Sequence, residues 1–455
     1  MASTPSNMTS SAASQSQPVS FRTETQFPLP SQKFMIPTSW KRYQLSQLIN
    51  KALSLEKPVP FDFLVRGELL HTTLSEWCAE NGVGEEETLE IEYIESVMPP
   101  QKMSDFPHED WVSSVSCQAP GYFFTASYDG QIRVFDYSKQ LIASSAAHAA
   151  PITSLCFVSS PKEGEVSSSY TIATASQDLT AQLTEITLDP TPSTSRASAT
   201  LHLHTSTVSS ISANSSGSHL LTSSWDGLIG LWDTTVPQSD EVPEAVVNER
   251  DRERRKRRKV DGEGQGARPR RKAPLLVLKS HVGRVSKVVW APGTTTAKAG
   301  KAYSCGFDST VRMWDTEYGV CEHTINASEK PFLDLTTTQD GSSILAVSSD
   351  RTMSLYDQRL STSGSLSSAA AATFIHPALP SSVCASQANA HQVVTGAYDG
   401  VVRVWDLRSV KGAMASFKAW DGGKKVLSVD WRRGVVGVGG EGGLEVWKVG
   451  EEKDS

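Results

Sequence analysis

The sequence predicts a mainly β protein, because one pattern recurs along most of the chain. A short run of β-branched and aromatic residues opens on an acidic turn residue and ends seven positions later. The run ends are spaced by about 45 residues, near the roughly 40–45 residues of a four-stranded propeller blade. One interval, from Asp233 to Asp315, is longer by an insertion. The copies run from Asp129 to Asp136, Asp178 to Glu185, Asp226 to Asp233, Asp308 to Asp315, Asp350 to Asp357, Asp399 to Asp406 and Glu441 to Lys448. Seven copies predict a seven-bladed β-propeller.

The best copies resemble WD40 repeats: DGLIGLWD (226–233), DSTVRMWD (308–315) and DGVVRVWD (399–406). A histidine precedes the inner strand of several blades, as is usual in such repeats: His108, His148, His204, His281 and, as a weaker match, His376. We expect two sets to form buried hydrogen-bonded networks that stiffen blades rather than catalytic triads: His204, Asp226 and Trp232, and His281, Asp308 and Trp314.

The sequence predicts how the ring closes, because the seventh blade lacks its outer strand at the carboxyl end. The chain ends soon after the strand LEVWKV (444–449), which leaves too little sequence for the outer strand of the seventh blade. Residues 101–107 are expected to supply that strand and so remove an open edge. The predicted propeller therefore spans residues 101–450.

A second, smaller domain is predicted for residues 19–100, after a disordered tail at residues 1–18. Segments 19–27 and 33–37 are expected to form a hairpin, and residues 41–53 have apolar side chains at helical spacing. A strand at 61–70, a helical turn at 74–82 and an alternating strand at 88–96 follow. This order predicts a ubiquitin-like β-grasp fold.

Composition limits the function classes. No apolar stretch of about 18 residues occurs, so no membrane span is expected, and the first residues lack the apolar core of a secretory signal. Six cysteines show no CxxC spacing, which indicates reduced thiols. The formal net charge is −7. The segment 249–272 nevertheless holds twelve basic and five acidic residues, so an acidic body carries one basic segment.

That basic segment lies in the predicted flexible insertion of blade 3, residues 236–273. It contains RRKRRK (254–259) and RPRRK (268–272) on a glycine-rich spacer, which resembles a bipartite nuclear localisation signal bound by importin. A solvated charge run and a contact with rRNA phosphates are the alternatives. The candidate import residues are Arg254, Arg255, Lys256, Arg257, Arg258, Lys259, Arg268, Arg270, Arg271 and Lys272.

The amino-terminal sequence segments point to a family more specifically than the repeats do. KRYQLSQLIN (41–50), EKPVPFDFLVRGELL (56–70) and TLEIEYIESVMPP (88–100) resemble the notchless-like domain of ribosome-assembly WD40 proteins. Two groups share that domain: the notchless-type factor with eight blades, and the WD40 subunit of the PeBoW complex with seven. Seven predicted blades and the EKPVPFDFL string favour the PeBoW subunit.

The resemblance implies a metal-dependent contact. In that family the ubiquitin-like domain binds the adhesion site of midasin, an AAA-type ATPase, and one loop carboxylate completes the coordination of a bound Mg²⁺. The matching loop is NGVGEEET (81–88), and the match places Glu86 at the ligand position. Mg²⁺ prefers oxygen ligands. Glu85 or Glu87 could be the ligand instead, and all three could simply be a solvated loop.

The resemblance also implies partners and a location. The propeller would dock on a block-of-proliferation-type scaffold that carries Pescadillo on the pre-60S particle, and midasin would pull the complex away, in the nucleoplasm or nucleolus of the nucleus. No cofactor of its own and no enzymatic activity are expected. The alternatives are a notchless-type pre-60S factor, a generic WD40 scaffold and a ubiquitin-ligase substrate receptor.

Overall fold

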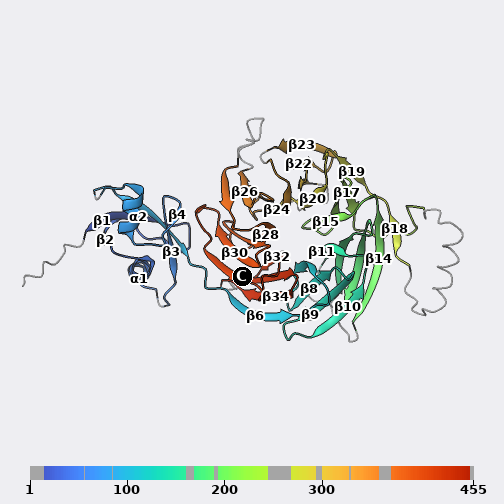
Figure 1. Ribbon diagram of the computed structural model, residues 1–455, viewed down its shortest axis with the longest axis horizontal. Helices are drawn as coiled ribbons and strands as arrows, with labels where there is room; N and C mark the ends of the chain where they lie inside the picture. Colours follow the sequence, from blue (N-terminus) through green and yellow to red (C-terminus); the bar gives the residue numbers. More distant parts are fainter. Residues whose placement is uncertain are drawn as a thin grey trace, which may run out of the picture. The chain divides into compact units, whose positions relative to one another are not determined.

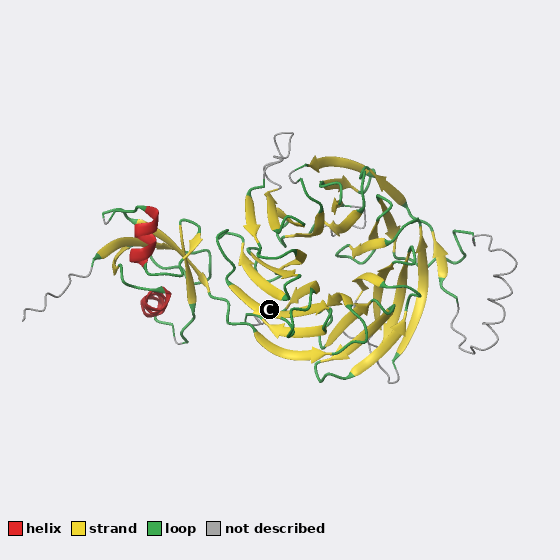
Figure 2. Ribbon diagram, viewed as in Figure 1, coloured by secondary structure: helices red, strands yellow, loops and turns green. Residues whose placement is uncertain are grey.

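The computed structural model describes residues 15–55, 57–84, 86–159, 169–188, 193–243, 268–293, 300–326, 329–357 and 370–450 (Figure 1). The chain divides into two compact units, Met1–Met98 with Arg408–Met414, and Pro99–Leu407 with Ala415–Ser455. Both helices of the described residues belong to the first unit, and strands build the second (Figure 2). The predicted mainly β fold class is confirmed.

The first unit holds a five-stranded sheet in the order β2-β1-β5-β3-β4, with β1 and β5 parallel and the other neighbours antiparallel. Its elements are β1 Ser16–Arg22, β2 Lys33–Pro37, α1 Arg42–Leu53, β3 Phe61–Val65, β4 Glu68–Leu69, α2 Leu74–Asn81 and β5 Leu89–Glu95. Fully buried Leu45 and Ile49 of α1 join the core formed by the sheet, where Phe61 packs edge-on against Tyr93. The predicted β-grasp order is confirmed.

Two details of this unit differ from the prediction. Strand β1 begins at Ser16, so the end of the predicted disordered tail belongs to the sheet. Residues 61–70 form a hairpin rather than one strand, because Arg66 and Gly67 both adopt positive φ (50° and 79°) and reverse the chain. Positive φ at both central residues is the geometry of a type I′ turn, which favours glycine.

Helix α2 shows why its short sequence folds locally. Thr73 accepts a hydrogen bond from the backbone N–H of Glu76, and the Glu76 side chain accepts one from the backbone N–H of Thr73. This capping box satisfies amide groups at the start of the helix. Gly82 ends the helix in the left-handed conformation (φ 63°). The helix therefore fixes where the loop 82–88 begins.

The second unit is a propeller of seven sheets among the described residues, each built from an inner strand outward (Figure 1). Blade 1 is β7 Val112–Ser116, β8 Tyr122–Ser127, β9 Gln131–Asp136 and β10 Leu141–Ala146. Blade 2 is β11 Ile152–Ser159, β12 Ser169–Ser176, β13 Thr180–Thr187, β14 Thr194–His202 and β18 Arg270–Lys272. Blade 3 is β15 Val208–Ala213, β16 His219–Ser224, β17 Leu228–Asp233 and β19 Leu276–Lys279.

The remaining blades follow the same order. Blade 4 is β20 Val285–Trp290, β21 Lys301–Gly306, β22 Val311–Asp315 and β23 Val320–Ile325. Blade 5 is β24 Phe332–Thr337, β25 Ser343–Ser348, β26 Thr352–Asp357 and β27 Ala372–Ile375. Blade 6 is β28 Pro380–Ala385, β29 Gln392–Ala397, β30 Val401–Asp406 and β31 Ala415–Lys418. Blade 7 is β32 Val426–Arg432, β33 Val435–Gly440, β34 Gly443–Lys448 and β6 Gln101–Phe106.

The closing strand lies where the sequence predicts it. Strand β6 pairs antiparallel with β34, and Figure 1 shows the cyan β6 beside the red β34. Lys102 Nζ also lies 2.6 Å from Glu445 Oε1 of β34. The last blade is therefore completed by residues that precede the first.

The fifth strand of blade 2 was not predicted. Strand β18 comes from the insertion within blade 3, between β17 and β19, and pairs in parallel with β14, with Arg270 opposite Ala199 (Figure 1). The prediction of a wholly flexible insertion at residues 236–273 is therefore wrong at its carboxyl end. Residues 244–267 lie outside the described part of the chain.

Candidate functional site

The recurring His, Asp and Trp positions of blades 3 and 4 form buried hydrogen-bonded networks, as predicted. In blade 3, His204 Nδ1 lies 3.2 Å from Asp226 Oδ2, and His204 Nε2 lies 2.8 Å from Thr222 Oγ1. Trp232 Nε1 donates to the same hydroxyl at 2.9 Å. Blade 4 repeats this with His281, Asp308 and Trp314 around the Ser304 hydroxyl. The hydroxyl that joins the histidine to the tryptophan is not part of the predicted sets.

Two other blades connect the same positions differently. In blade 6, His376 Nδ1 lies 3.3 Å from the Phe374 carbonyl oxygen, and Asp399 pairs with Arg403 at 2.6 Å. Blade 1 has the same arrangement, with the carbonyl of Phe106 and the pair Asp129–Arg133. Burial lowers the pKa of His376 to about 4, and the contacts of its ring nitrogens are the Phe374 carbonyl and the Thr395 hydroxyl. An arginine four residues after the turn Asp does not by itself predict this arrangement, because Arg312 of blade 4 has the same spacing from Asp308, which contacts His281.

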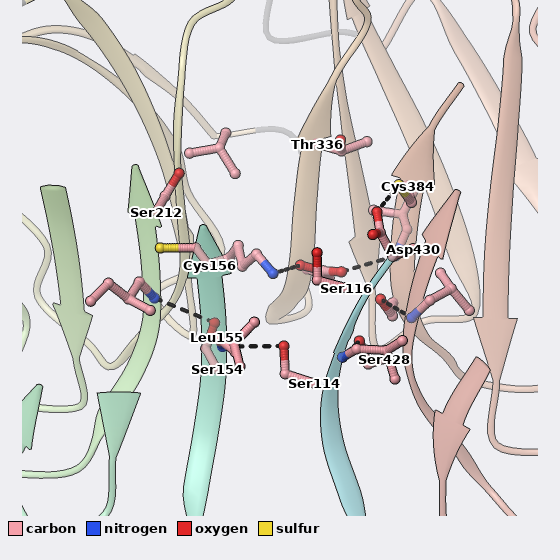
Figure 3. A pocket seen from close by; sticks show the side chains of 18 of the residues that line it. Ser114, Ser116, Ser154, Leu155, Cys156, Ser212, Thr336, Cys384, Ser428 and Asp430 are labelled. Carbon is pink, nitrogen blue, oxygen red and sulfur yellow. Dashed lines mark hydrogen bonds and ion pairs between the residues drawn. The ribbon is translucent and has the colours of Figure 1, made fainter. Parts of the chain in front are cut away.

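A cavity of about 260 Å³ lies on the propeller axis and is lined by the inner strands of all seven blades. Its serines tie neighbouring blades together: Ser114 Oγ accepts from the backbone N–H of Leu155 at 3.2 Å, and Ser428 Oγ accepts from Val115 at 3.2 Å (Figure 3). The equivalent acceptors elsewhere are Ser154, Ser210, Asp334 and Ser382. These hydroxyls join the inner strands of neighbouring blades around the cavity.

Blade 4 is the exception in this ring of acceptors. Its equivalent residue is Lys287, an ammonium that has no lone pair to accept a hydrogen bond. Lys287 Nζ instead lies 3.4 Å from Asp334 Oδ1 of blade 5. The same Asp334 oxygen accepts from the backbone N–H of Leu335 at 3.0 Å. An ion pair therefore replaces the serine contact between blades 4 and 5.

The acidic loop of the β-grasp unit connects α2 to β5, and its backbone is held by a buried side chain. Gln17 of β1 is only 2% exposed. Its Nε2 donates to the carbonyl oxygens of Gly84 at 3.0 Å and Glu87 at 2.5 Å. One amide group thus fixes both sides of the turn that carries Glu86.

The described acidic side chains of this loop differ in their contacts. The Glu87 carboxylate pairs with the guanidinium of Arg66, which stands in the turn between β3 and β4. Glu86 is exposed and forms no ion pair or hydrogen bond with any residue that the structure describes. Glu85 lies outside the described residues. The Glu86 carboxylate is therefore available to a ligand, whereas the Glu87 carboxylate is already paired with Arg66.

The second basic cluster of the insertion is built into the propeller. Lys272 is 2% exposed, and its Nζ lies 2.6 Å from Asp233 Oδ1, the terminal Asp of the blade-3 repeat. Burial alone would raise the pKa of Asp233, but the contact with Lys272 outweighs it and lowers that pKa. The backbone of Arg271 is bonded to Asp240 and Glu241. The prediction that Lys272 belongs to an exposed import signal is therefore wrong.

The other candidate import residues divide into two groups. Arg268 and Arg270 are exposed, and Arg271 is half-buried with its guanidinium bonded to the Pro243 carbonyl oxygen at 3.2 Å. The first cluster lies outside the described residues: Arg254, Arg255, Lys256, Arg257, Arg258 and Lys259. Of the second cluster, Arg270, Arg271 and Lys272 form strand β18, whose backbone is paired with β14.

Among the residues described here, no group of three or more His, Cys, Asp or Glu side chains is placed to hold a metal ion. No described helix is long and apolar enough to cross a membrane.

A β-grasp domain followed by a seven-bladed propeller with His–Asp–Trp networks defines a notchless-like WD40 protein. The family comparisons agree: residues 18–78 match the NLE (NUC135) domain, and residues 101–136, 195–233, 272–315 and 373–406 match the WD domain, G-beta repeat.

The similarity to known proteins covers nearly the whole chain. The chain is 65% identical over 441 residues to ribosome biogenesis protein YTM1 of Laccaria bicolor, covering 96% of both chains. It is 60% identical to the protein of the same name in Coprinopsis cinerea, covering 98% of this chain and 97% of that protein. Identity to the Schizosaccharomyces pombe protein is 30%, over 90% of this chain and 91% of that one. The chain belongs to the YTM1 family of ribosome biogenesis proteins.

Proposed function

We propose that this protein is a ribosome biogenesis factor of the pre-60S particle whose two units have separate tasks. The propeller anchors it to a PeBoW-type assembly, a block-of-proliferation-type WD40 scaffold with Pescadillo. The β-grasp unit is the handle through which the midasin ATPase removes that assembly during 60S maturation and rRNA processing. Seven blades support this assignment over the eight-bladed notchless-type factor.

The handle depends on Glu86. An exposed carboxylate without a partner costs little to bring to a metal ion, whereas Glu87 would first have to leave Arg66. The Gln17 bonds hold the loop backbone, so little conformational freedom is lost on binding. The Glu86 carboxylate would supply one oxygen ligand to an Mg²⁺ ion held by midasin. This protein itself needs no cofactor and catalyses no reaction in this scheme.

The test is binding of the full chain to the adhesion-site domain of midasin, with Mg²⁺ and with a chelator. Glu86→Ala should weaken binding by about 100-fold, since even outer-shell partners of metal ligands are worth about 10–100-fold in affinity. Glu80→Ala, which removes an exposed carboxylate from α2, is the matched control and should bind as the wild type does. Glu87→Gln should also retain binding.

Two results would overturn the handle. Binding that persists in the chelator would exclude a shared metal ion. Loss of binding in Glu87→Gln but not in Glu86→Ala would move the ligand by one residue, against the contacts of the loop.

Nuclear and nucleolar location is part of the proposal. The cluster at residues 254–259 is the remaining import candidate that importin could bind, because Lys272 is buried and β18 is paired with β14. Contact of the exposed Arg268 and Arg270 with rRNA phosphates is compatible with this role.

A further inference from the structure

One face of the propeller presents the same two positions in every blade. The residue before the inner strand accepts, through its carbonyl, a hydrogen bond from the backbone N–H of the residue that follows the second strand. In blade 4 these residues are Arg284 and Phe307, joined at 2.7 Å, and in blade 7 they are Lys425 and Glu441, joined at 3.1 Å. The other pairs are Trp111 and Tyr128, Pro151 and Gln177, Thr207 and Trp225, Pro331 and Ser349, and Leu379 and Tyr398. Because the blades repeat around one axis, all these pairs lie on the same face of the ring.

Blades 3 and 4 carry an exposed apolar group at this face. Trp225 is 41% exposed, Phe307 is 45% exposed and Val282, in the loop before β20, is 92% exposed. The guanidinium of Arg284 stacks on the indole of Trp225, with Cζ 4.6 Å from the ring centroid. We call Trp225, Val282, Arg284 and Phe307 the blade 3–4 corner.

The charge of this corner is not balanced by a neighbour. Arg284 is exposed and forms no ion pair with any carboxylate of the described residues. Stacking on an aromatic ring holds the plane of a guanidinium but leaves its edge N–H groups free to donate. Those donors match a carboxylate, which accepts two parallel bonds from one guanidinium.

In blade 7 the two equivalent positions form an ion pair, so the positive charge there is balanced. Lys425 stands where blade 4 has Arg284, and Glu441 stands where blade 4 has Phe307. Lys425 Nζ lies 3.4 Å from Glu441 Oε1, and it also lies 5.9 Å from the Trp111 ring centroid. In blade 4 a phenylalanine takes the place of that carboxylate, so the cation and an apolar surface both face outward.

We propose that the blade 3–4 corner docks a partner protein through a short extended segment that carries a carboxylate beside an apolar side chain. The carboxylate binds the stacked Arg284, and the apolar side chain packs on Trp225, Val282 and Phe307. Aromatic and arginine side chains are the types that dominate binding energy in protein interfaces. This contact is separate from the Glu86 handle and does not depend on it.

The test selects random peptides displayed on phage against the full chain and measures the selected peptides by titration. The expected peptides contain an acidic residue next to an aliphatic or aromatic one. Arg284→Glu should weaken their binding by about tenfold or more, the size expected for a charge-assisted bidentate pair. Phe307→Glu should weaken it similarly, because it gives Arg284 an internal carboxylate at the position where blade 7 has Glu441.

Two controls separate this contact from others. Arg196→Glu changes an exposed arginine on the outer strand β14 and should leave binding unchanged, as should Glu86→Ala. Thermal unfolding of each variant shows whether the ring is intact. The proposal is overturned if no peptide is selected above background, if the selected peptides lack a carboxylate, or if folded Arg284→Glu binds them as the wild type does.

Discussion

The hydroxyl of Thr222 allows a single substitution to test the hydrogen-bonded network of blade 3. It is fully buried, lies 2.8 Å from His204 Nε2 and accepts from Trp232 Nε1 at 2.9 Å. Thr222→Val keeps nearly the same shape but removes the oxygen. The buried indole N–H and the imidazole nitrogen then both lose their partner.

The expected cost follows from counting those two groups. Each buried polar group left without a hydrogen bond costs about 1–3 kcal/mol. The added methyl group recovers at most about 0.8 kcal/mol. Thr222→Val should therefore destabilise the propeller by about 1–5 kcal/mol, which lowers Tm by several degrees at about 2 °C per kcal/mol.

Thr222→Ser is the matched control, because blade 4 already uses a serine, Ser304, at this position. It keeps the hydroxyl and loses one methyl group, at a cost of about 1 kcal/mol. Thermal unfolding followed by circular dichroism at one fixed scan rate compares the two. A Thr222→Val protein that melts at or above the temperature of Thr222→Ser would refute the role assigned to the hydroxyl.

Three further changes test other parts of the structure. Burial holds the pKa of His376 at about 4, below the roughly 6.5 of an unfolded histidine, so the stability that neutral His376 contributes is complete above pH 6.5 and is lost as pH falls toward 4. His376→Gln should therefore flatten the fall of Tm between pH 6.5 and 4, and an unchanged slope would contradict the assignment. Lys272→Ala leaves Asp233 without its cation and should lower Tm by more than Arg270→Ala does, because the Arg270 side chain is exposed. Removing one partner of a fully buried ion pair costs about 3–5 kcal/mol, and the cost is smaller here because Asp233 is partly exposed. Neutralising residues 254–259 should abolish nuclear accumulation of a fluorescent fusion while Arg270→Ala does not, and the reverse result would assign import to β18.

The features that the sequence predicts well are those set by local pattern. Each repeat carries its own turn residue, strand and terminal aromatic, so the seven blades follow from counting. The predicted closing strand at residues 101–107 is confirmed by the pairing of β6 with β34. The β-grasp elements follow from apolar spacing and from signals such as Gly82, which ends α2.

The features that were missed depend on partners distant in sequence. Strand β18 has three residues and pairs with β14 of another blade, so no local periodicity indicates it. The turn at Arg66 and Gly67 is a local exception: apolar residues stand on both sides of it, so the segment has the pattern of one strand. Within the acidic loop, three adjacent glutamates look alike in sequence, and only the contact between Glu87 and Arg66 distinguishes two of them.

Strand β6 gives the ring a mechanical property as well as a closed edge. It is the first propeller strand after residue 98, and among the described strands it pairs with β34. Tension that reaches the propeller along the backbone from Pro99 therefore enters it at Gln101. Tension strong enough to separate Gln101–Phe106 from β34 would expose the edge of blade 7 before it reached any other blade. The strand that makes the ring continuous is also the part of the ring that bears such a load first.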